Sequence, residues 1–178
     1  MFTRDRIRRR GADQYQIRLR PNERALVADL VDQLRQQLLA STDDPAVRRL
    51  FPPAYPQDAE RDAGYQVLTR DDLLESRLAA LEVVERTVDG ADLDGEDMAA
   101  WTGTLNSLRL VIGTRLDVGE DAPDLDPDDP LAQAYAVYEF LGWLLSQAVD
   151  VLSADLELPD EPRRPPPTPP APSGPPDG

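Results

Sequence analysis

The stretch that decides the fold is residues 94–116, which read DGEDMAAWTGTLNSLRLVIGTRL. Large apolar side chains recur there in alternating steps of three and four residues, as they do on one face of an α-helix. They are Met98, Trp101, Leu105, Leu108 and Ile112. Asp94, with Asp97 three positions later, is typical of a helix start. This is the most regular apolar stripe in the chain, so we expect it to form the central helix.

Three further segments show helical spacing. Leucine at every fourth position predicts a helix that follows Pro21 and Asn22 and runs to about residue 40. A capping sequence at Thr69 and Asp72, followed by spaced leucines, predicts a helix from there to Asp89-Gly90. Pro130 begins the last helix, which we expect Pro159 to end. Its predicted apolar stripe is Leu131, Tyr135, Tyr138, Leu141, Leu145, Val149 and Leu152. The predicted fold class is therefore mainly α, a bundle of about four amphipathic helices.

The N-terminal residues have a different period. Tyr15, Ile17 and Leu19 alternate with polar residues, which predicts a half-buried strand over residues 14–20. Residues 2–10 precede it across a short turn at Gly11-Ala12-Asp13. We expect these two segments to form a small antiparallel β-hairpin.

The composition excludes several kinds of chemistry. The 178 residues include 0 Cys and 0 His, and every basic residue is Arg. The chain therefore has no thiolate nucleophile, disulfide switch, imidazole base, usual zinc site, Schiff-base lysine or P-loop lysine. We expect it not to be an enzyme, and we assign no catalytic, cofactor-binding or metal-binding residues.

The charge of the chain also restricts its partners. The net charge is -15 and the isoelectric point is about 4.3, so the folded body should repel phosphates and direct binding to nucleic acid is disfavoured. No apolar run approaches the roughly 18 residues of a membrane span. The Arg-rich start is followed by polar residues instead of the apolar core of a secretory signal. We expect a cytoplasmic protein.

The end of the chain differs from the rest. Residues 159–178 contain ten of the 18 prolines and no Leu, Ile, Val or aromatic residue. Such a segment buries too little apolar surface to offset the entropy lost on ordering. We expect a single helical domain over residues 1–158 and a disordered, proline-rich tail over residues 159–178 that contributes nothing to folding.

Two acidic loops resemble calcium loops but lack essential residues. In the first, Asp124, Asp126 and Asp128 alternate, but the sixth position is Asp129 where Gly is required and the twelfth is Tyr135 where Glu is required. The second, which begins at residue 92, also lacks the Gly. We expect solvated charges in both loops and no metal site. The acidic pairs at residues 43–44, 71–72 and 128–129 are interpreted as helix caps.

Two arginines stand within the most apolar part of the predicted central helix, Arg109 and Arg115. They could bind an anion, or they could be structural and pair with carboxylates of the acidic body. We favour the structural interpretation. It predicts a carboxylate partner for each arginine and a substantial loss of stability in Arg115→Gln.

Three ordered stretches of this chain resemble a family of small actinobacterial proteins, a domain of unknown function later named for the actinomycete oxidative stress regulator (AosR-like). The first comprises Asp44-Pro45 and residues 49–55, RLFPPAY; the second comprises Trp101 and residues 105–116, LNSLRLVIGTRL; the third is residues 138–141, YEFL. The resemblance covers about residues 2–153 and omits the proline-rich tail.

The resemblance implies a cytoplasmic regulator that contacts an RNA polymerase sigma factor in oxidative-stress transcription. Redox sensing through a cysteine pair is associated with the family, and this chain, which has 0 Cys, cannot switch in that way. Two alternatives remain open: a carboxylate-dependent metal-binding protein or enzyme, and an acidic mimic of nucleic acid, whose binding would depend strongly on salt. The residues do not indicate the partner, the regulatory trigger or the oligomeric state.

Overall fold

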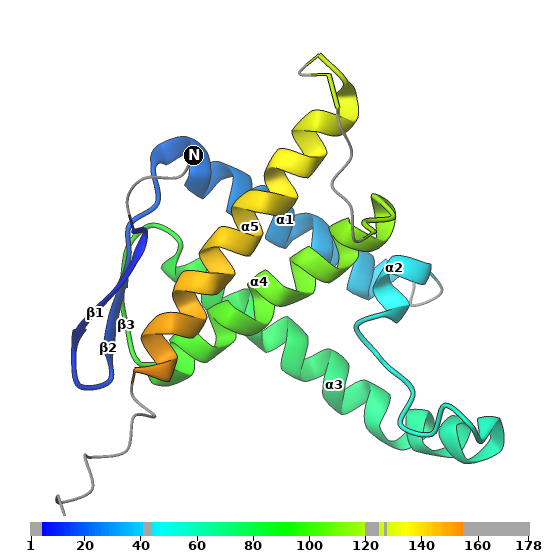
Figure 1. The fold of residues 1–178 in the computed structure, drawn as a ribbon. Coiled ribbons are helices and arrows are strands. Elements are labelled where there is room, and N and C mark those ends of the chain that lie inside the picture. Colours follow the sequence, from blue (N-terminus) through cyan, green and yellow to red (C-terminus); the bar gives the residue numbers. More distant parts are fainter. Residues whose placement is uncertain (1–4, 41–43, 120–124, 127, 155–178) are drawn as a thin grey trace, which may run out of the picture.

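The computed structural model describes residues 5–40, 44–119, 125–126 and 128–154. Along the chain these residues form β1 (Ile7–Gly11), β2 (Gln14–Ile17), α1 (Pro21–Ala40), α2 (Pro45–Arg48), α3 (Ala59–Thr87), β3 (Asp92–Leu93), α4 (Gly95–Arg115) and α5 (Pro130–Ser153). The long helices cross one another, and the small sheet stands at one end of them (Figure 1). The predicted fold class, a mainly α bundle with a small N-terminal hairpin, is confirmed. The predicted tail lies outside the described residues, so the boundary at residue 158 stays a prediction.

The hairpin is one part of a three-stranded antiparallel sheet of order β1-β2-β3. Ile7 lies opposite Ile17 across the hairpin. The turn between the strands places Asp13 at a φ of 52°, a left-handed conformation that Asp tolerates better than most residues. The predicted buried face of β2 is confirmed, since Tyr15 is 1% exposed. The pairing of β2 with the two-residue β3, where Tyr15 faces Leu93, was not predicted.

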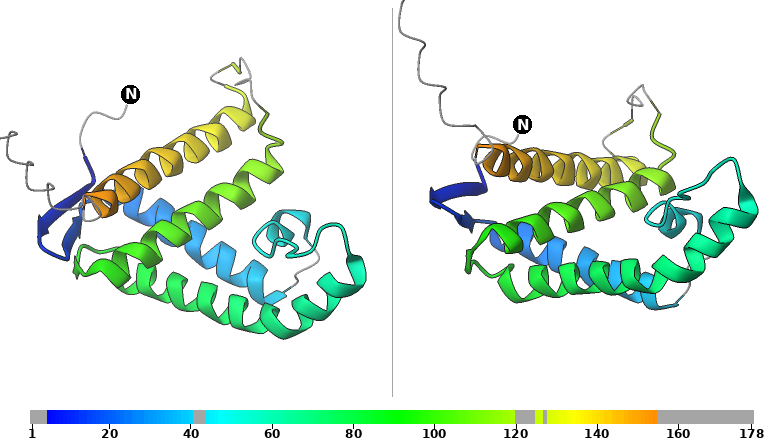
Figure 2. Two further views of the ribbon diagram at one scale, coloured as in Figure 1. Left: turned by 60° about the horizontal axis from the view of Figure 1, so that its bottom comes forward. Right: turned by 90° about the horizontal axis from the view of Figure 1, so that it is seen from below.

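Helix α4 is the centre of the helical body, as predicted. It lies between α3 and α5 (Figure 2) and also contacts α1 and α2. Asp94 caps its start by accepting a hydrogen bond from the backbone N–H of Asp97 at 2.8 Å. Four of the five predicted core positions are buried, while at the fifth step Val111 is buried and Ile112 is half-buried. Because α4 contacts the four other helices, it holds most of the core together.

Helix α3 begins ten residues before its predicted start. Asp58 caps it by accepting from the backbone N–H of Arg61 at 3.0 Å. Thr69, predicted as the cap, lies inside the helix, where its hydroxyl donates to the carbonyl oxygen of Tyr65 at 2.9 Å. The predicted capping role of residues 71–72 is wrong for the same reason. The first turns of α3 pack little against the body, so they have no apolar stripe from which a helix could be predicted.

Helices α1 and α5 occur where they were predicted, but only part of each predicted apolar stripe is buried. In α1, Leu34 and Leu38 of the leucine stripe are buried, whereas Leu26 and Leu30 are half-buried. Val27 and Val31, beside the leucines, are also buried. The buried side chains of α5 are Phe140, Leu141, Leu144 and Ala148. Predicted core residues Leu131 and Val149 are 50% and 44% exposed. Apolar residues occur on most sides of α5, so spacing alone does not identify the face that meets α4.

Two of the acidic pairs cap the start of a helix, as they were interpreted. Asp129 caps α5 by accepting from the backbone N–H of Leu131 at 2.8 Å, as predicted. Asp44 likewise acts as a cap, as predicted, by accepting from the backbone N–H of Ala46 at 2.8 Å. The short helix that it caps, α2, was not among the predicted helices. Helix α5 ends at Ser153, before Pro159, which lies outside the described residues.

Among the residues that the structure describes, no helix has the length and apolarity needed to span a bilayer.

A buried ion pair fastens the N-terminal strand to the helices. Arg6 donates to both carboxylate oxygens of Glu23 on α1, at 2.7 and 2.9 Å. The side chain of Gln147 on α5 accepts from the backbone N–H groups of Arg6 and Ile7, at 2.6 and 3.2 Å. Both charged side chains are about one-tenth exposed or less, at 8% and 11%. The sheet, α1 and α5 therefore meet at one charged contact, which the sequence did not indicate.

Candidate functional site

The three sequence stretches that carry the family resemblance meet around α4. Arg115 at the end of α4 donates to the carboxylate of Asp44, which begins the first stretch, at 3.0 Å. Arg109, six residues earlier on α4, donates to the hydroxyl of Tyr138 on α5 at 3.0 Å. These arginines therefore connect the second stretch to both of the others.

Arg115 has the carboxylate partner that the structural interpretation predicts. It also donates to the side-chain oxygen of Gln37 at 2.9 Å. The pair with Asp44 is accessible to water, however, because its side chains are 45% and 37% exposed. The pKa of Asp44 is lowered, first by the hydrogen bond from the Ala46 N–H and second by Arg115. The acid is therefore held mainly by its own helix.

We expect Arg115→Gln to leave the urea midpoint of unfolding nearly unchanged. Exposed ion pairs contribute little to stability, and Asp44 keeps its hydrogen bond from the backbone without Arg115. A substantial loss of stability was predicted from the sequence, on the assumption that the ion pair of Arg115 is shielded from water. The exposed pair reverses that prediction. Urea unfolding followed by circular dichroism at pH 7 measures the effect. A drop as large as that caused by breaking the buried Arg6–Glu23 pair would contradict the prediction.

The prediction that Arg109 has a carboxylate partner is wrong. Within the described part of the chain it has none; its guanidinium carbon lies 4.5 Å from the centre of the Tyr138 ring. Its Nε is buried and has no hydrogen-bond partner. A Cβ added at Gly142 would lie 2.9 Å from this Nε, and one at Gly113 would lie 3.0 Å from the Tyr138 ring. Glycine at these two positions lets Arg109 and Tyr138 occupy the crossing of α4 and α5.

A third arginine, Arg77 on α3, was not identified from the sequence. It donates to the carbonyl oxygen of Leu50 and, at 3.1 Å, to the hydroxyl of Ser107 on α4. Burial lowers its pKa. Its guanidinium carbon lies 5.5 Å from the centre of the Phe51 ring. One sequence signal could have identified Arg77: it stands next to Leu78 of the predicted apolar stripe.

The first turns of α3 form an arm, defined here as residues 59–70, that extends away from the other helices (Figure 1). Val67 and Leu68 on this arm are 80% and 77% exposed. Its inner side is held by aromatic contacts: the rings of Tyr55 and Tyr65 meet edge-on at 6.1 Å, and Arg61 lies 4.1 Å from the centre of the Tyr55 ring. The arm is therefore a braced element that presents apolar side chains to water.

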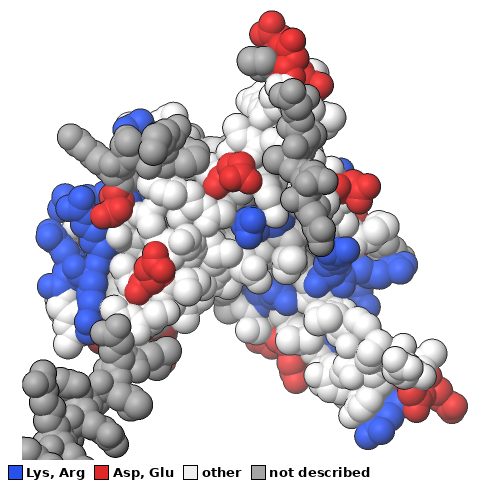
Figure 3. Space-filling view, in the orientation of Figure 1, with Lys and Arg blue, Asp and Glu red and all other residues white. Residues whose placement is uncertain are grey.

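Basic side chains gather over α2, next to the arm (Figure 3). Arg48 and Arg49 are exposed there, although the chain carries a net charge of -15. Arg70 of the arm lies 5.3 Å from the Phe51 ring. Exposed apolar side chains of the arm and exposed basic side chains of α2 therefore lie on neighbouring elements.

The acidic loops have structural roles where they can be described. Asp94 caps α4, and Asp97 pairs with Arg86. Asp126 accepts from the backbone N–H of Asp128 at 3.1 Å. Asp124 of the first loop and Asp43 lie outside the described residues. Within the described ranges, no group of three or more acidic side chains is close enough to hold a metal ion.

The chain belongs to the family described as Domain of unknown function (DUF2017), whose model matches residues 4–152. This confirms the family resemblance.

Among its relatives are proteins named oxidative stress regulator AosR. Those of Mycobacterium tuberculosis and Mycobacterium bovis are 31% identical to this chain over 127 aligned residues, covering 61% of this chain and 58% of theirs. A putative oxidative stress regulator AosR of Mycobacterium leprae is 27% identical over 130 residues, covering 63% of this chain and 60% of its own length. The match thus spans about three-fifths of the length of these relatives. No solved structure matches the chain.

Proposed function

We propose that this protein is a non-enzymatic regulator of the oxidative-stress response that acts by binding another protein. The observation that carries the proposal is the α3 arm, with Val67 and Leu68 exposed at 80% and 77%. Large apolar side chains that stand together in water are typical of a protein-binding surface. The relatives named oxidative stress regulators supply the process in which such a surface would act.

The partner that we propose is an RNA polymerase sigma factor of the stress response, in keeping with the family resemblance. The surface of the arm and α2 would bind an element with an apolar stripe beside acidic side chains. The apolar residues would provide affinity, and Arg48 and Arg49 would provide orientation and a faster association rate. Helix-on-helix contact is the simplest geometry, because the arm is itself an exposed helix.

The regulatory signal would not be a disulfide within this chain. The chain has 0 Cys, so oxidation cannot form such a bond within it. The proposed contact therefore does not require a redox change in this chain.

Direct binding of the purified full-length chain to the purified stress sigma factor of its host tests this proposal. We expect Val67→Glu with Leu68→Glu to weaken binding at least tenfold, because two charges would replace the apolar contact. Glu is a good helix former, so the arm should remain helical. Leu131→Glu on α5, at a position that is 50% exposed, is the matched control and should bind as the wild type does.

Biolayer interferometry at two salt concentrations measures both affinity and charge dependence. The proposal fails if the wild-type chain does not bind the sigma factor, or if the arm variant and the α5 control bind equally well. Unchanged circular dichroism of all three proteins would show that a difference in binding is not a difference in folding.

A further inference from the structure

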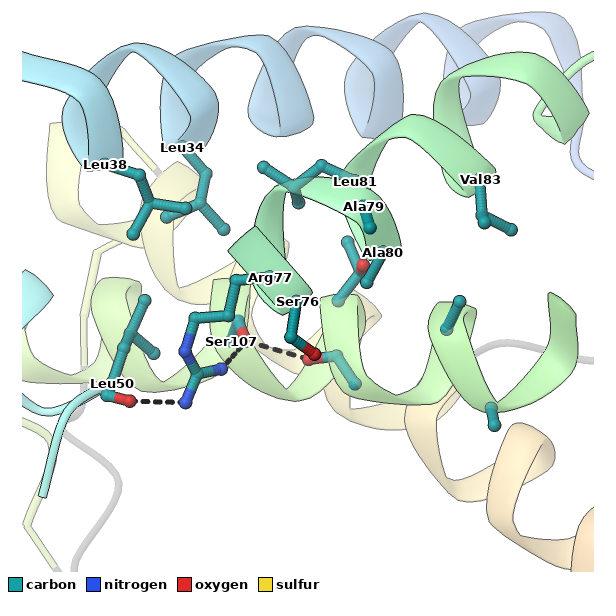
Figure 4. A pocket seen from close by; sticks show the side chains of 14 residues that line it. Leu34, Leu38, Leu50, Ser76, Arg77, Ala79, Ala80, Leu81, Val83 and Ser107 are labelled. Atoms are coloured by element: carbon teal, nitrogen blue, oxygen red, sulfur yellow. Dashed lines mark hydrogen bonds between the residues drawn. The ribbon is translucent and has the colours of Figure 1, made fainter. Parts of the chain in front are cut away.

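A groove lies between α3 and α4, and residues of α1 also line it. Its volume is about 410 Å³, within the roughly 300–1,000 Å³ of small-molecule sites. Buried leucines form its floor: Leu34, Leu38, Leu50 and Leu81. Small residues form its walls, among them Ala79 and Ala80 on α3 and Ala100 and Gly103 on α4. The groove is thus apolar over most of its surface (Figure 4).

Arg77 supplies a positive charge at one end of this groove. Figure 4 shows its guanidinium between Leu50 and Ser107, whose carbonyl and hydroxyl oxygens accept hydrogen bonds from it. Both acceptors are neutral, and the described residues provide no carboxylate partner for Arg77. A guanidinium has five N–H donors and stays charged in proteins. The Nε of Arg77 is buried with no partner, so the cation is only partly hydrogen-bonded and its charge is not neutralised.

Thr104 supplies a second polar group without a partner. It lies on α4, lines the same groove, and is 2% exposed. Its hydroxyl oxygen has no hydrogen-bond partner, although buried polar groups in folded proteins nearly always have one. The groove therefore combines an apolar lining with a cation that has no carboxylate partner among the described residues and a hydroxyl that has no hydrogen-bond partner.

We propose that this groove binds an amphipathic monocarboxylate, with the carboxylate on Arg77 and the hydrocarbon chain along the leucine floor. A planar carboxylate matches the fork of N–H donors on a guanidinium. A hydrocarbon chain fits the small-residue walls, which leave room beside the leucines. A multiply charged anion is disfavoured, because Arg77 is the one arginine among the described residues that line the groove and the chain has a net charge of -15.

This site is separate from the protein-binding arm and does not depend on the proposed function. It would give the protein a small-molecule input that needs no cysteine. The ligand class is that of medium-chain fatty acids and related amphipathic acids.

Calorimetric titration of the full chain with three probes tests the proposal. We expect decanoate to bind at one saturable site. Acetate, which lacks the hydrocarbon chain, and 1-decanol, which lacks the charge, should each bind at least tenfold more weakly. Equal binding of decanoate and decanol would overturn the role of Arg77, and no binding of decanoate would overturn the site.

Two variants locate the site. Gly103 lines the groove, and nothing lies within 4 Å of a Cβ added there, so the side chain of Gly103→Leu begins in open space at the groove. Leucine is also a better helix former than glycine, so the melting temperature should not fall. We expect Gly103→Leu to weaken decanoate binding at least tenfold. Binding equal to that of the wild type would place decanoate elsewhere and overturn the proposal.

Arg77→Gln should weaken decanoate binding by a similar factor and leave that of decanol unchanged. Arg109→Gln is the matched control, because Arg109 is a half-buried arginine that contacts α5 instead of the groove. It should bind decanoate as the wild type does. If Arg77→Gln fails to fold, the result for Gly103→Leu decides the proposal by itself.

Discussion

Glu23→Gln is expected to lower the free energy of unfolding at pH 7 by about 3 kcal/mol, since removing one partner of a buried ion pair leaves the other charge uncompensated. The amide keeps the size of the carboxylate but not its charge, so the buried ion pair between Arg6 and residue 23 is lost. Glu23 also accepts a hydrogen bond from the backbone N–H of Arg20 at 2.8 Å, and this bond loses its charge assistance. Urea unfolding followed by circular dichroism measures the loss.

The same pair makes stability depend on pH. The hydrogen bond from Arg6 holds the pKa of Glu23 below its usual value. A lowered pKa in the folded state means that the stabilisation is fully present above the unfolded value, about 4.3, and is lost as pH falls through the folded value. The difference between wild type and Glu23→Gln should therefore be constant from pH 6 to 8 and shrink below about pH 4.

Glu85→Gln is the matched control for this prediction. Glu85 accepts from both Nε and Nη2 of Arg35, at 2.9 and 2.8 Å, so the geometry resembles that of the Arg6–Glu23 pair. Its side chain is 38% exposed and that of Arg35 is 28% exposed, so water stabilises the charge that remains. We expect a much smaller change in the urea midpoint. Equal losses in the two variants would show that burial does not set the cost.

Trp101→Ala is expected to cost about 4 kcal/mol, within the roughly 3–5 kcal/mol for removing a buried aromatic side chain. Trp101 is 0% exposed and is among the largest fully buried side chains of the described core. Its indole N–H donates to the hydroxyl of Thr87 on α3 at 2.8 Å, so the substitution leaves a cavity and removes a contact between α3 and α4. Because whole domains are stable by only about 5–15 kcal/mol, this variant should be close to unfolding at 37 °C.

Trp143→Ala provides the comparison for Trp101. Trp143 is half-buried on α5, and its ring lies 5.5 Å from the guanidinium carbon of Arg6. The two variants remove the same atoms, so a difference in the melting temperature reports burial and not residue type. We expect the smaller drop for Trp143→Ala. The reverse order would show that α5 and not α4 is the centre of the core.

The sequence alone determined those features that depend on neighbouring residues. The apolar steps of α4 and the leucines of α1 predicted both helices, because the period of an amphipathic helix is a local property of the backbone. Asp94 and Asp129 predicted helix starts because a capping side chain binds an N–H two or three residues away. The alternation at Tyr15 predicted the strand for the same local reason. The absence of Cys and His excluded chemistries without any structure.

The tertiary structure alone decided which charges meet and which face of each helix is buried. Arg6 pairs with Glu23 on another element, and Arg109 donates a hydrogen bond to Tyr138 instead of pairing with one of the many acidic residues. Arg77 and Thr104 line a groove only because α3 crosses α4 at small residues. The arm of α3 escaped prediction because a helix that packs little against the body carries no apolar period. Such pairings depend on how helices cross in space, and a single sequence with 34 acids for 19 arginines leaves too many combinations to choose among.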